Sequence, residues 1–233
     1  MENATSTLKI VISGYGKMGK MVEQVLAQQG IACVAKTCDV AALDDAVACD
    51  AVCIDFSTPA AFRANYAELA RKFKAVVVGT TGWYDIKQDV FAAFKQAGTT
   101  LIWASNFSIG VTVMSAAVSL ISRLLGAAGG YSPYIVEKHH IHKLDAPSGT
   151  AKTLAGLVQA GMGVEPAVAS VRVGEIAGIH TVGFEGACDR ITIEHEAFSR
   201  QGFAQGAVLA ATMTQGLATG IYEFQEMIVK NLQ

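Results

Sequence analysis

Charged side chains are scarce in this 233-residue chain, where Asp, Glu, Lys and Arg make up 16% of the residues, below the roughly 25% of soluble domains. The two signs nearly cancel to a net charge of -2. No basic run occurs, which excludes the electrostatic footprint of a nucleic-acid-binding protein and a polybasic membrane patch. With only 4 prolines and 52% hydrophobic residues, the chain is neither disordered nor collagen-like. Low charge instead predicts a globular homo-oligomer whose copies cover part of each other's surface.

Cysteine is also sparse. The 5 cysteines are odd in number and form no C-x-x-C pair, which argues against a disulfide framework and a zinc ribbon. The polar segment before Ile10 does not resemble a signal peptide, so we expect a reducing, cytoplasmic location. Residues 96–122 lack charge over a membrane-spanning length, but serines, a glycine and an asparagine interrupt them. We expect a buried strand, a loop and a buried helix there.

The first hundred residues predict a parallel sheet with crossover helices, because short β-branched runs alternate with amphipathic stretches. Strands are expected at residues 10–12, 32–36, 51–55, 75–78 and 101–104. From about residue 108 the pattern changes to a helix over residues 111–125 and to strict alternation, as at residues 191–195, which is typical of an antiparallel or mixed sheet. A small-residue helix is expected over 206–220 and a closing helix over 221–232. The fold class is therefore α/β, with a parallel-sheet domain and a second α+β domain.

A glycine-rich turn stands between the first predicted strand and the first predicted helix. Its residues are Gly14, Tyr15, Gly16, Lys17, Met18 and Gly19, a G-x-G-x-x-G sequence. In that position the first glycine permits a tight turn, the second lets the backbone approach a pyrophosphate, and the third lets helix and strand pack closely. This placement favours dinucleotide binding over an incidental turn.

The preference between NADH and NADPH stays open. An acidic residue about 20 positions further on, at the end of the second strand, usually takes the adenosine ribose hydroxyls. Here Asp39 is a candidate ribose ligand and Lys36 could approach a 2'-phosphate, although both could also be solvated loop residues. Because the two charges oppose each other, we predict use of both cofactors, with KM values within about tenfold, or about 1.4 kcal/mol.

Three of the five histidines fall within four positions, at His139, His140 and His142, and Lys143 follows them. A histidine that titrates near neutrality can donate a proton, and the lysine adds a positive charge for a carboxylate. The alternatives are a solvated histidine-rich strand edge and a metal site. No metal is predicted, because further ligands at suitable spacing are missing.

Ser148, Gly149 and Thr150 lead into a predicted helix directly after this cluster. Backbone N–H groups and hydroxyls at a helix start form an anion site. A cation, a proton donor and an anion site together predict binding of a small carboxylate substrate.

Residues 137–151 read E-x-H-H-x-x-K-x-D-A-P-S-G-T-A, which resembles the signature of the dihydrodipicolinate (4-hydroxy-tetrahydrodipicolinate) reductase family of the diaminopimelate route to lysine. Segments at residues 14–19, 55–57, 79–82, 106–110 and 174–180 agree in order. The resemblance implies a Rossmann-type domain over residues 1–107 plus 212–233, a substrate-binding and oligomerisation domain over 108–211, and a homotetramer. It also implies reduction of a cyclic dicarboxylate imine to tetrahydrodipicolinate by NADH or NADPH.

The resemblance also implies roles by position. His139 corresponds to the catalytic acid or base and Lys143 to its proton-donating partner. His140, Gly149 and Thr150 correspond to substrate contacts, to which the helix-start argument adds Ser148. The loops that would hold the nicotinamide end of the cofactor are Gly79, Thr80 and Thr81, and Ala104, Ser105, Asn106 and Phe107.

The chain departs from the family pattern in two places. The end of the second strand lacks the family's frequent Glu or Glu-Arg pair, and residues 161–173 are shorter than in many members. Two other functions compete with this interpretation: a semialdehyde-type dehydrogenase with a nucleophilic cysteine, and a non-catalytic dinucleotide sensor. Cys33 and Cys53 lie inside apolar strands, where a thiol is normally inert, and a sensor would not need the histidine-rich segment.

Overall fold

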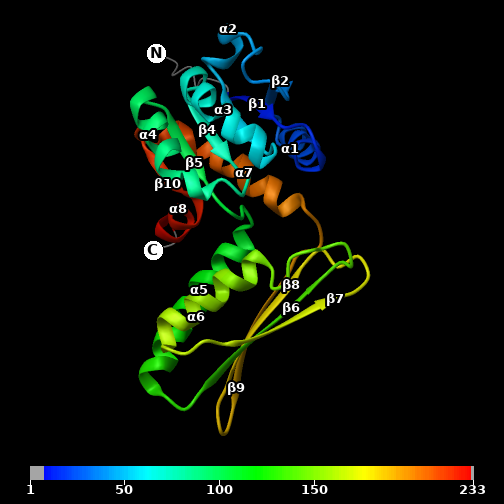
Figure 1. The fold of residues 1–233 in the computed structure, drawn as a ribbon, viewed down its shortest axis with the longest axis vertical. Helices are drawn as coiled ribbons and strands as arrows, with labels where there is room; N and C mark the ends of the chain where they lie inside the picture. The colour runs from blue at the N-terminus through cyan, green and yellow to red at the C-terminus, as the bar shows by residue number, and fades with distance from the viewer. Residues whose placement is uncertain (1–7, 232–233) are drawn as a thin grey trace. The chain divides into compact units, whose positions relative to one another are not determined.

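The structure is a computed structural model that describes residues 8–231. It separates into two compact units, Met1–Phe107 with Gln201–Gln233, and Ser108–Arg200 (Figure 1). The first unit therefore begins its C-terminal segment at Gln201, whereas the sequence division begins it at residue 212. The residues concerned form a helix that packs on the first unit's own sheet. The assignment of residues 1–107 plus 212–233 to dinucleotide binding and of residues 108–211 to substrate binding and oligomerisation stays a prediction.

The first unit is built on a six-stranded, wholly parallel sheet. Its strands are β1 (Lys9–Ser13), β2 (Ala32–Thr37), β3 (Val52–Asp55), β4 (Ala75–Val78), β5 (Thr100–Trp103) and β10 (Ile221–Glu223). They lie in the order β10-β5-β4-β3-β1-β2. The chain thus runs outward to β2 and then crosses back to β3, so a topological switch point falls beside β1. This is the doubly wound α/β class that the sequence predicts.

Helices cover both faces of this sheet (Figure 1). One face carries α1 (Lys17–Gln28), α7 (Gln201–Met213) and α8 (Phe224–Asn231), and the other carries α2 (Asp45–Ala48), α3 (Pro59–Lys72) and α4 (Lys87–Ala97). Alternate strand residues point to opposite faces. In β3, for example, Val52 and Ile54 enter the core beside α1, and Cys53 enters the core beside α3. Continuous apolar strands are therefore buried on both sides.

The second unit packs two helices on a four-stranded mixed sheet. The helices are α5 (Ile109–Ala128) and α6 (Gly149–Met162), and the strands are β6 (Ser132–His139), β7 (Ala167–Arg172), β8 (Ile179–Glu185) and β9 (Arg190–Glu196). The strand order is β7-β6-β8-β9, with β7 parallel to β6 and the other pairs antiparallel. Its core joins Met114 and Val118 of α5 to Leu154 of α6 and to Val182 and Phe184 of β8.

Helix α5 is only partly buried, in contrast to the buried helix expected from the sequence. Its core face packs on α6 and β9, while Ile109, Val113, Leu120 and Leu124 are exposed. Among the described residues it is the one helix that is long and apolar enough to cross a membrane by length and composition, with a mean hydropathy of 1.7. A core helix of a soluble protein passes the same test.

The C-terminal segment differs from its predicted elements. The small-residue helix runs over Gln201–Met213, not 206–220, and a short 3-10 turn, Thr214–Gly216, follows it. Inside α7 a Cβ at position 206 would lie 1.8 Å from the Phe107 carbonyl oxygen, so glycine there permits close packing. The predicted closing helix is also wrong in part, because Ile221–Glu223 forms β10 before α8 begins. Residue 232 lies outside the described residues.

Candidate active site

The predicted cofactor loops all follow strands of the parallel sheet at its carboxyl edge. The glycine-rich turn follows β1, residues 79–81 follow β4, and residues 104–107 follow β5. Because β1, β3, β4 and β5 are neighbours in that sheet, the structure brings these segments to one edge. Ligands of open α/β sheets bind outside the carboxyl ends of the strands, at a switch point.

The glycine-rich turn has the shape that a pyrophosphate requires. Gly14 has φ +86°, and a Cβ there would lie 2.5 Å from the Phe56 carbonyl oxygen. A Cβ at Gly19 would lie 2.3 Å from the Gly14 carbonyl oxygen, so these two glycines permit close packing. Gly16 faces open space and is the N-cap of α1, with no side chain bonded to the helix start. The start of α1 therefore lacks a side-chain cap, as a helix start that binds an anion does, and the residues fit a dinucleotide.

Asp55 ties three strand ends together at this edge, which sequence reasoning missed. Its buried carboxylate accepts hydrogen bonds from the hydroxyls of Ser13 (2.6 Å), Thr80 (2.5 Å) and Ser57 (3.0 Å). Burial raises the pKa of Asp55, and these hydrogen bonds oppose the rise. The residue occurred only as part of a motif, and nothing in the sequence indicated that three strands converge on it.

The predicted nicotinamide loops divide into buried and exposed positions. Thr80 and Ala104 are buried, and the Phe107 ring packs in the core against Phe56 and Phe224, with centroid distances of 6.3 and 4.9 Å. Thr81 and Ser105 are exposed. Gly79 lies against the Phe56 ring, where a Cβ would come within 2.1 Å. The buried members hold the loops in place, which leaves backbone groups and the exposed members to face a ligand.

In the second unit, His139 lies beside a buried carboxylate at the end of β6. Its Nδ1 contacts Glu137 Oε2, and Glu137 is fully buried. Arg172 at the end of β7 donates to Glu137 Oε1 (2.7 Å) and to the Asp145 carbonyl oxygen (2.6 Å). Burial opposes the charge on Glu137, but hydrogen bonds from Arg172, Ser170 and His139 lower its pKa to about 2. Glu137 is therefore a carboxylate that fixes the orientation of the His139 ring.

His180 joins His139 to the start of α6. The His139 and His180 rings meet edge to face, with centroids 5.1 Å apart. Ser148 Oγ lies 3.0 Å from His180 Nε2 and also accepts the Ala151 N–H (3.2 Å) as the N-cap of α6. Gly149 faces open space, since a Cβ there would meet nothing within 4 Å. The predicted anion site at the start of α6 is thus placed beside the histidines.

Lys143 and His140 complete the predicted cluster. The Lys143 ammonium pairs with Asp145 (2.7 Å), and its side chain is 24% exposed. Within the described chain, Nδ1 of His140, Nδ1 of His180 and Nε of Arg172 are buried without a hydrogen-bond partner. Buried polar groups normally have partners, so these donors and acceptors are available to a polar ligand.

The atoms of Glu137, His139 and His180 also lie close enough to be considered as metal ligands, within 4.8 Å of one another. However, Glu137 is already paired with Arg172, and the positive charges of Arg172 and Lys143 act on His139. An incoming cation would compete with Arg172 for the Glu137 carboxylate and would meet this positive charge. The three side chains are explained by their contacts with one another, with Arg172 and with Ser148.

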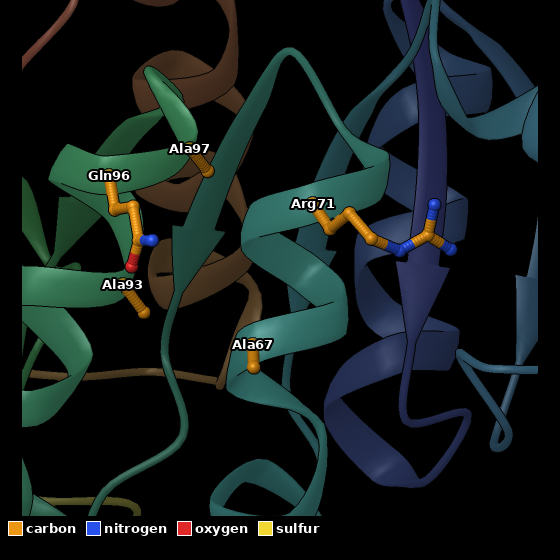
Figure 2. Close-up of a pocket in the computed structure, with 5 residues that line it drawn as sticks. All are labelled: Ala67, Arg71, Ala93, Gln96 and Ala97. Atoms are coloured by element: carbon orange, nitrogen blue, oxygen red, sulfur yellow. The ribbon is translucent and has the colours of Figure 1, made fainter.

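A hollow on the first unit lies between α3 and α4 and is lined by Ala67, Arg71, Ala93, Gln96 and Ala97 (Figure 2). Its charged residue, Arg71, is paired with Glu68 and Asp45. None of these lining residues belongs to the predicted site. The hollow offers neither a nucleophile nor an acid, so it is not the catalytic site.

Comparison with known proteins identifies the family. Sequence profiles for the N-terminus and the C-terminus of dihydrodipicolinate reductase match residues 8–107 and 110–228. The chain belongs to the dihydrodipicolinate reductase family. It is therefore an oxidoreductase of a family that uses NADH or NADPH, as the resemblance implies.

Relatives span most of the chain. A 4-hydroxy-tetrahydrodipicolinate reductase from Xanthomonas euvesicatoria pv. vesicatoria is 41% identical over 180 residues, covering 76% of this chain and 73% of that protein. One from Stenotrophomonas maltophilia is 42% identical over 177 residues, covering 76% and 72%. A structure of dipicolinate-bound dihydrodipicolinate reductase from Paenisporosarcina sp. TG-14 has a TM-score of 0.77 at 20% identity, covering 94% and 99%. The last comparison concerns the fold alone and confirms the predicted fold class.

Membership of the reductase family argues against the alternative of a semialdehyde-type dehydrogenase with a nucleophilic cysteine. Burial raises the pKa of Cys53 well above its usual range, and burial also raises the pKa of Cys33. Thiolates are the reactive form of cysteine, so these two are poor nucleophiles.

The stability of the reductase should fall in mild acid because of His180. Burial lowers its pKa to about 4 from a usual 6.5. Between these pH values the unfolded chain binds more protons than the folded chain, so the free energy of unfolding falls as pH falls from about 6.5 to 4. The difference of about 2.5 in pKa, 6.5 minus 4, corresponds to about 3.4 kcal/mol in full, and roughly 2–3 kcal/mol of it is lost between pH 7 and about pH 4.5. Urea unfolding at pH 7 and at about pH 4.5 measures it.

His180→Gln supplies the control for this prediction. The variant should lose less stability over the same pH change, because glutamine does not titrate. Part of the slope remains, since burial also lowers the pKa of His139 and of His195. Equal losses in wild type and variant would exclude His180 as the titrating group.

Proposed function

We propose that this chain reduces 4-hydroxy-tetrahydrodipicolinate, by way of its dehydrated form dihydrodipicolinate, to tetrahydrodipicolinate in the diaminopimelate route to lysine, and that its second unit holds the substrate and delivers the proton. One observation carries the assignment of the site: the Glu137–His139 pair, the Lys143 ammonium and the open start of α6 belong to one cluster. The family's relatives carry the name of this reaction, and a structural neighbour was solved with dipicolinate bound.

The substrate's two carboxylates match the positive groups of the cluster. We assign one carboxylate to the N–H groups of Gly149 and Thr150 with the Thr150 hydroxyl, because a helix start favours an anion. The Lys143 ammonium and the unpartnered nitrogen of His140 serve the same dianion. Ser148 acts indirectly, since its hydroxyl already caps α6 and contacts His180.

His139 is assigned as the acid. Burial lowers its pKa, Glu137 raises it, and the charges of Lys143 and Arg172 lower it. A dianionic substrate would offset these two positive charges, so substrate binding favours the protonated ring at the moment when a proton is needed. Glu137 holds Nδ1, which leaves Nε2 to present the proton.

The first unit contributes the cofactor site. When bound, the reduced nicotinamide supplies a hydride to C4 of the conjugated ring. The start of α1 would hold the pyrophosphate, and residues 79–81 and 104–107 would face the nicotinamide end. Electron density then builds on the ring, and the protonated His139, supported by Lys143, supplies the proton that completes the reduction.

An absorbance assay tests the function. Purified protein is mixed with freshly made 4-hydroxy-tetrahydrodipicolinate and NADH or NADPH, and loss of the nicotinamide band is followed. We expect substrate-dependent loss of absorbance and competitive inhibition by pyridine-2,6-dicarboxylate. Binding of the cofactor without turnover would instead support the dinucleotide sensor.

We also propose a cytoplasmic homotetramer. The low charge content and the exposed apolar residues Ile191 of β9 and Val171 of β7 support contacts between copies. Analytical ultracentrifugation of the purified protein measures the oligomeric state, and we expect the mass of a tetramer.

The Thr150 hydroxyl gives a separate prediction. Thr150→Val should raise the substrate KM by about tenfold, because one hydrogen bond to a charged carboxylate is lost. The dissociation constant of NADH should stay within twofold, because the glycine-rich turn lies in the other unit. Equal weakening of cofactor binding would assign the start of α6 to the dinucleotide instead.

A further inference from the structure

An acidic side chain on α1 pairs with Lys36, the lysine that the sequence offers as a candidate to approach a 2'-phosphate. Glu23 Oε1 lies 2.7 Å from the Lys36 ammonium, and its other oxygen accepts the Tyr15 hydroxyl. The ammonium also lies over the Tyr15 ring, 5.0 Å from its centroid. Sequence reasoning weighed Lys36 against Asp39 and did not consider Glu23, because Glu23 lies in α1, 13 residues before Lys36.

These side chains lie near the position expected for the adenosine ribose, where NADPH carries a 2'-phosphate and NADH carries a hydroxyl. Tyr15 belongs to the glycine-rich turn, and the Gly14 N–H donates to the Thr37 carbonyl oxygen (2.9 Å), which ties that turn to the end of β2. The end of the second strand is where a Rossmann-type domain distinguishes a ribose hydroxyl from a 2'-phosphate. Lys36 lies in β2 one residue before that end.

Asp39 has a local role that limits its reach. Its Oδ1 accepts the N–H groups of Ala41 (3.0 Å) and Ala42 (3.2 Å), which holds the turn after β2. One carboxylate oxygen, Oδ2, is left to accept a hydrogen bond from a ribose hydroxyl. Asp39 can therefore still accept a hydrogen bond from a ribose hydroxyl, while Lys36 is already paired.

We propose that Glu23 is a specificity-determining residue that restrains the use of NADPH by occupying Lys36. The inference rests on the proposed dinucleotide binding. A 2'-phosphate carries nearly two negative charges, and it can use Lys36 only if the ammonium leaves Glu23. The Glu23 carboxylate, which stays nearby, also repels the phosphate. A free 2'-hydroxyl has neither cost, so the same pair leaves NADH binding unaffected.

The pair is exposed enough to exchange partners. The side chains of Lys36 and Glu23 are 43% and 34% exposed, and exposed ion pairs are weak. The Lys36 ammonium can therefore leave Glu23 for a 2'-phosphate at a small cost, which agrees with use of both cofactors. A purely structural role, linking α1 to β2, would affect both cofactors equally.

The test compares two adenosine ligands by calorimetry on the full-length protein, without turnover. The probes are ADP and 2',5'-ADP, which differ in the 2'-phosphate and the 5' group, so each variant is judged on the change in their ratio. Glu23→Gln should tighten 2',5'-ADP by about fivefold, the scale of one exposed ion pair, with ADP within twofold. The gain should shrink in high salt, because exposed charges are screened.

Two further variants make the result specific. Glu68→Gln removes the same charge from another exposed ion pair. Glu68 lies on α3, on the other face of the sheet from α1, and is 2.9 Å from Arg71. This variant should leave the ratio of the ADP and 2',5'-ADP affinities unchanged. When Lys36 is already replaced in Lys36→Gln, adding Glu23→Gln should give at most half of the gain in 2',5'-ADP affinity. That part is due to the lost repulsion between the Glu23 carboxylate and the 2'-phosphate.

The outcomes separate the two proposals. A ratio that Glu23→Gln leaves unchanged, a full gain without Lys36, or the same gain in Glu68→Gln would overturn the role of Glu23 while dinucleotide binding stands. Failure of wild type to bind ADP, 2',5'-ADP and NADH would overturn both proposals. A matching shift in the KM ratio of NADPH to NADH in Glu23→Gln would extend the result to catalysis.

Discussion

His139→Ala should lower kcat by about 10²-fold or more, the usual contribution of a positioned general acid. Lys143→Ala should lower kcat in the same way, because the ammonium supports the proton transfer and carries charge opposite to the substrate's. Cofactor affinity should stay near wild type in both variants, since the glycine-rich turn lies in the other unit. Steady-state kinetics at saturating substrate and NADH titration measure the two quantities.

His142→Ala is the matched control. His142 belongs to the same histidine cluster, but its side chain is 70% exposed and faces Glu175 at 3.4 Å. We expect kcat within about twofold of wild type for this variant. Full turnover in both His139→Ala and Lys143→Ala would show that the proton comes from elsewhere.

Glu137→Gln should have the largest effect on stability. It leaves the Arg172 guanidinium beside a neutral amide in a buried position, and breaking a buried pair costs about 3–5 kcal/mol. Arg172 is 19% exposed and keeps the Asp145 carbonyl oxygen as acceptor, so we expect about 3 kcal/mol. Urea unfolding at pH 7 measures the loss.

The same variant should change the pH profile. The Glu137 carboxylate raises the pKa of His139, so its removal lowers that pKa further, and the limb of the kcat/KM profile that reports His139 moves to lower pH. A purely structural Glu137 would lower stability without moving that limb.

Two variants define the origin of the stability loss. Glu194→Gln removes a carboxylate that accepts the Thr181 hydroxyl at 2.6 Å on the exposed part of the sheet, and should cost less than about 1 kcal/mol. The double variant Glu137→Gln/Arg172→Gln should cost less than the sum of its two single changes, because the charges interact. Additive costs would contradict the pairing.

The sequence was sufficient where the signal is local. The glycine-rich turn, the apolar strands and the helix start at Ser148 each depend on neighbouring residues, and each is at its predicted place. Strand β10 was missed because three residues, Ile221–Glu223, carry no periodicity of their own. The parallel sheet accepts them because β5 offers a free edge.

Partners that come from distant strands could not be predicted. Arg172 reaches Glu137 because β6 and β7 pair with His139 opposite Arg172, and His180 faces the same cluster because it pairs with Glu137. The register of strand pairs that lie 33 and 43 residues apart in the chain follows from the whole sheet and not from any one segment. Glu137 and His180 belong to segments that resemble the family pattern, whereas Arg172 does not, and none of the contacts among these residues was predicted.

Hydride transfer from the cofactor to the substrate ring is the central claim, and isotope labelling tests it most directly. The protein is supplied with 4-hydroxy-tetrahydrodipicolinate and NADH that carries deuterium at the transferred position of C4, in ordinary water, and the product is analysed by mass spectrometry. We predict tetrahydrodipicolinate with one deuterium at ring C4, formed in step with loss of the nicotinamide band. Oxidation of NADH without deuterium in the product, or no oxidation at all, would contradict the account.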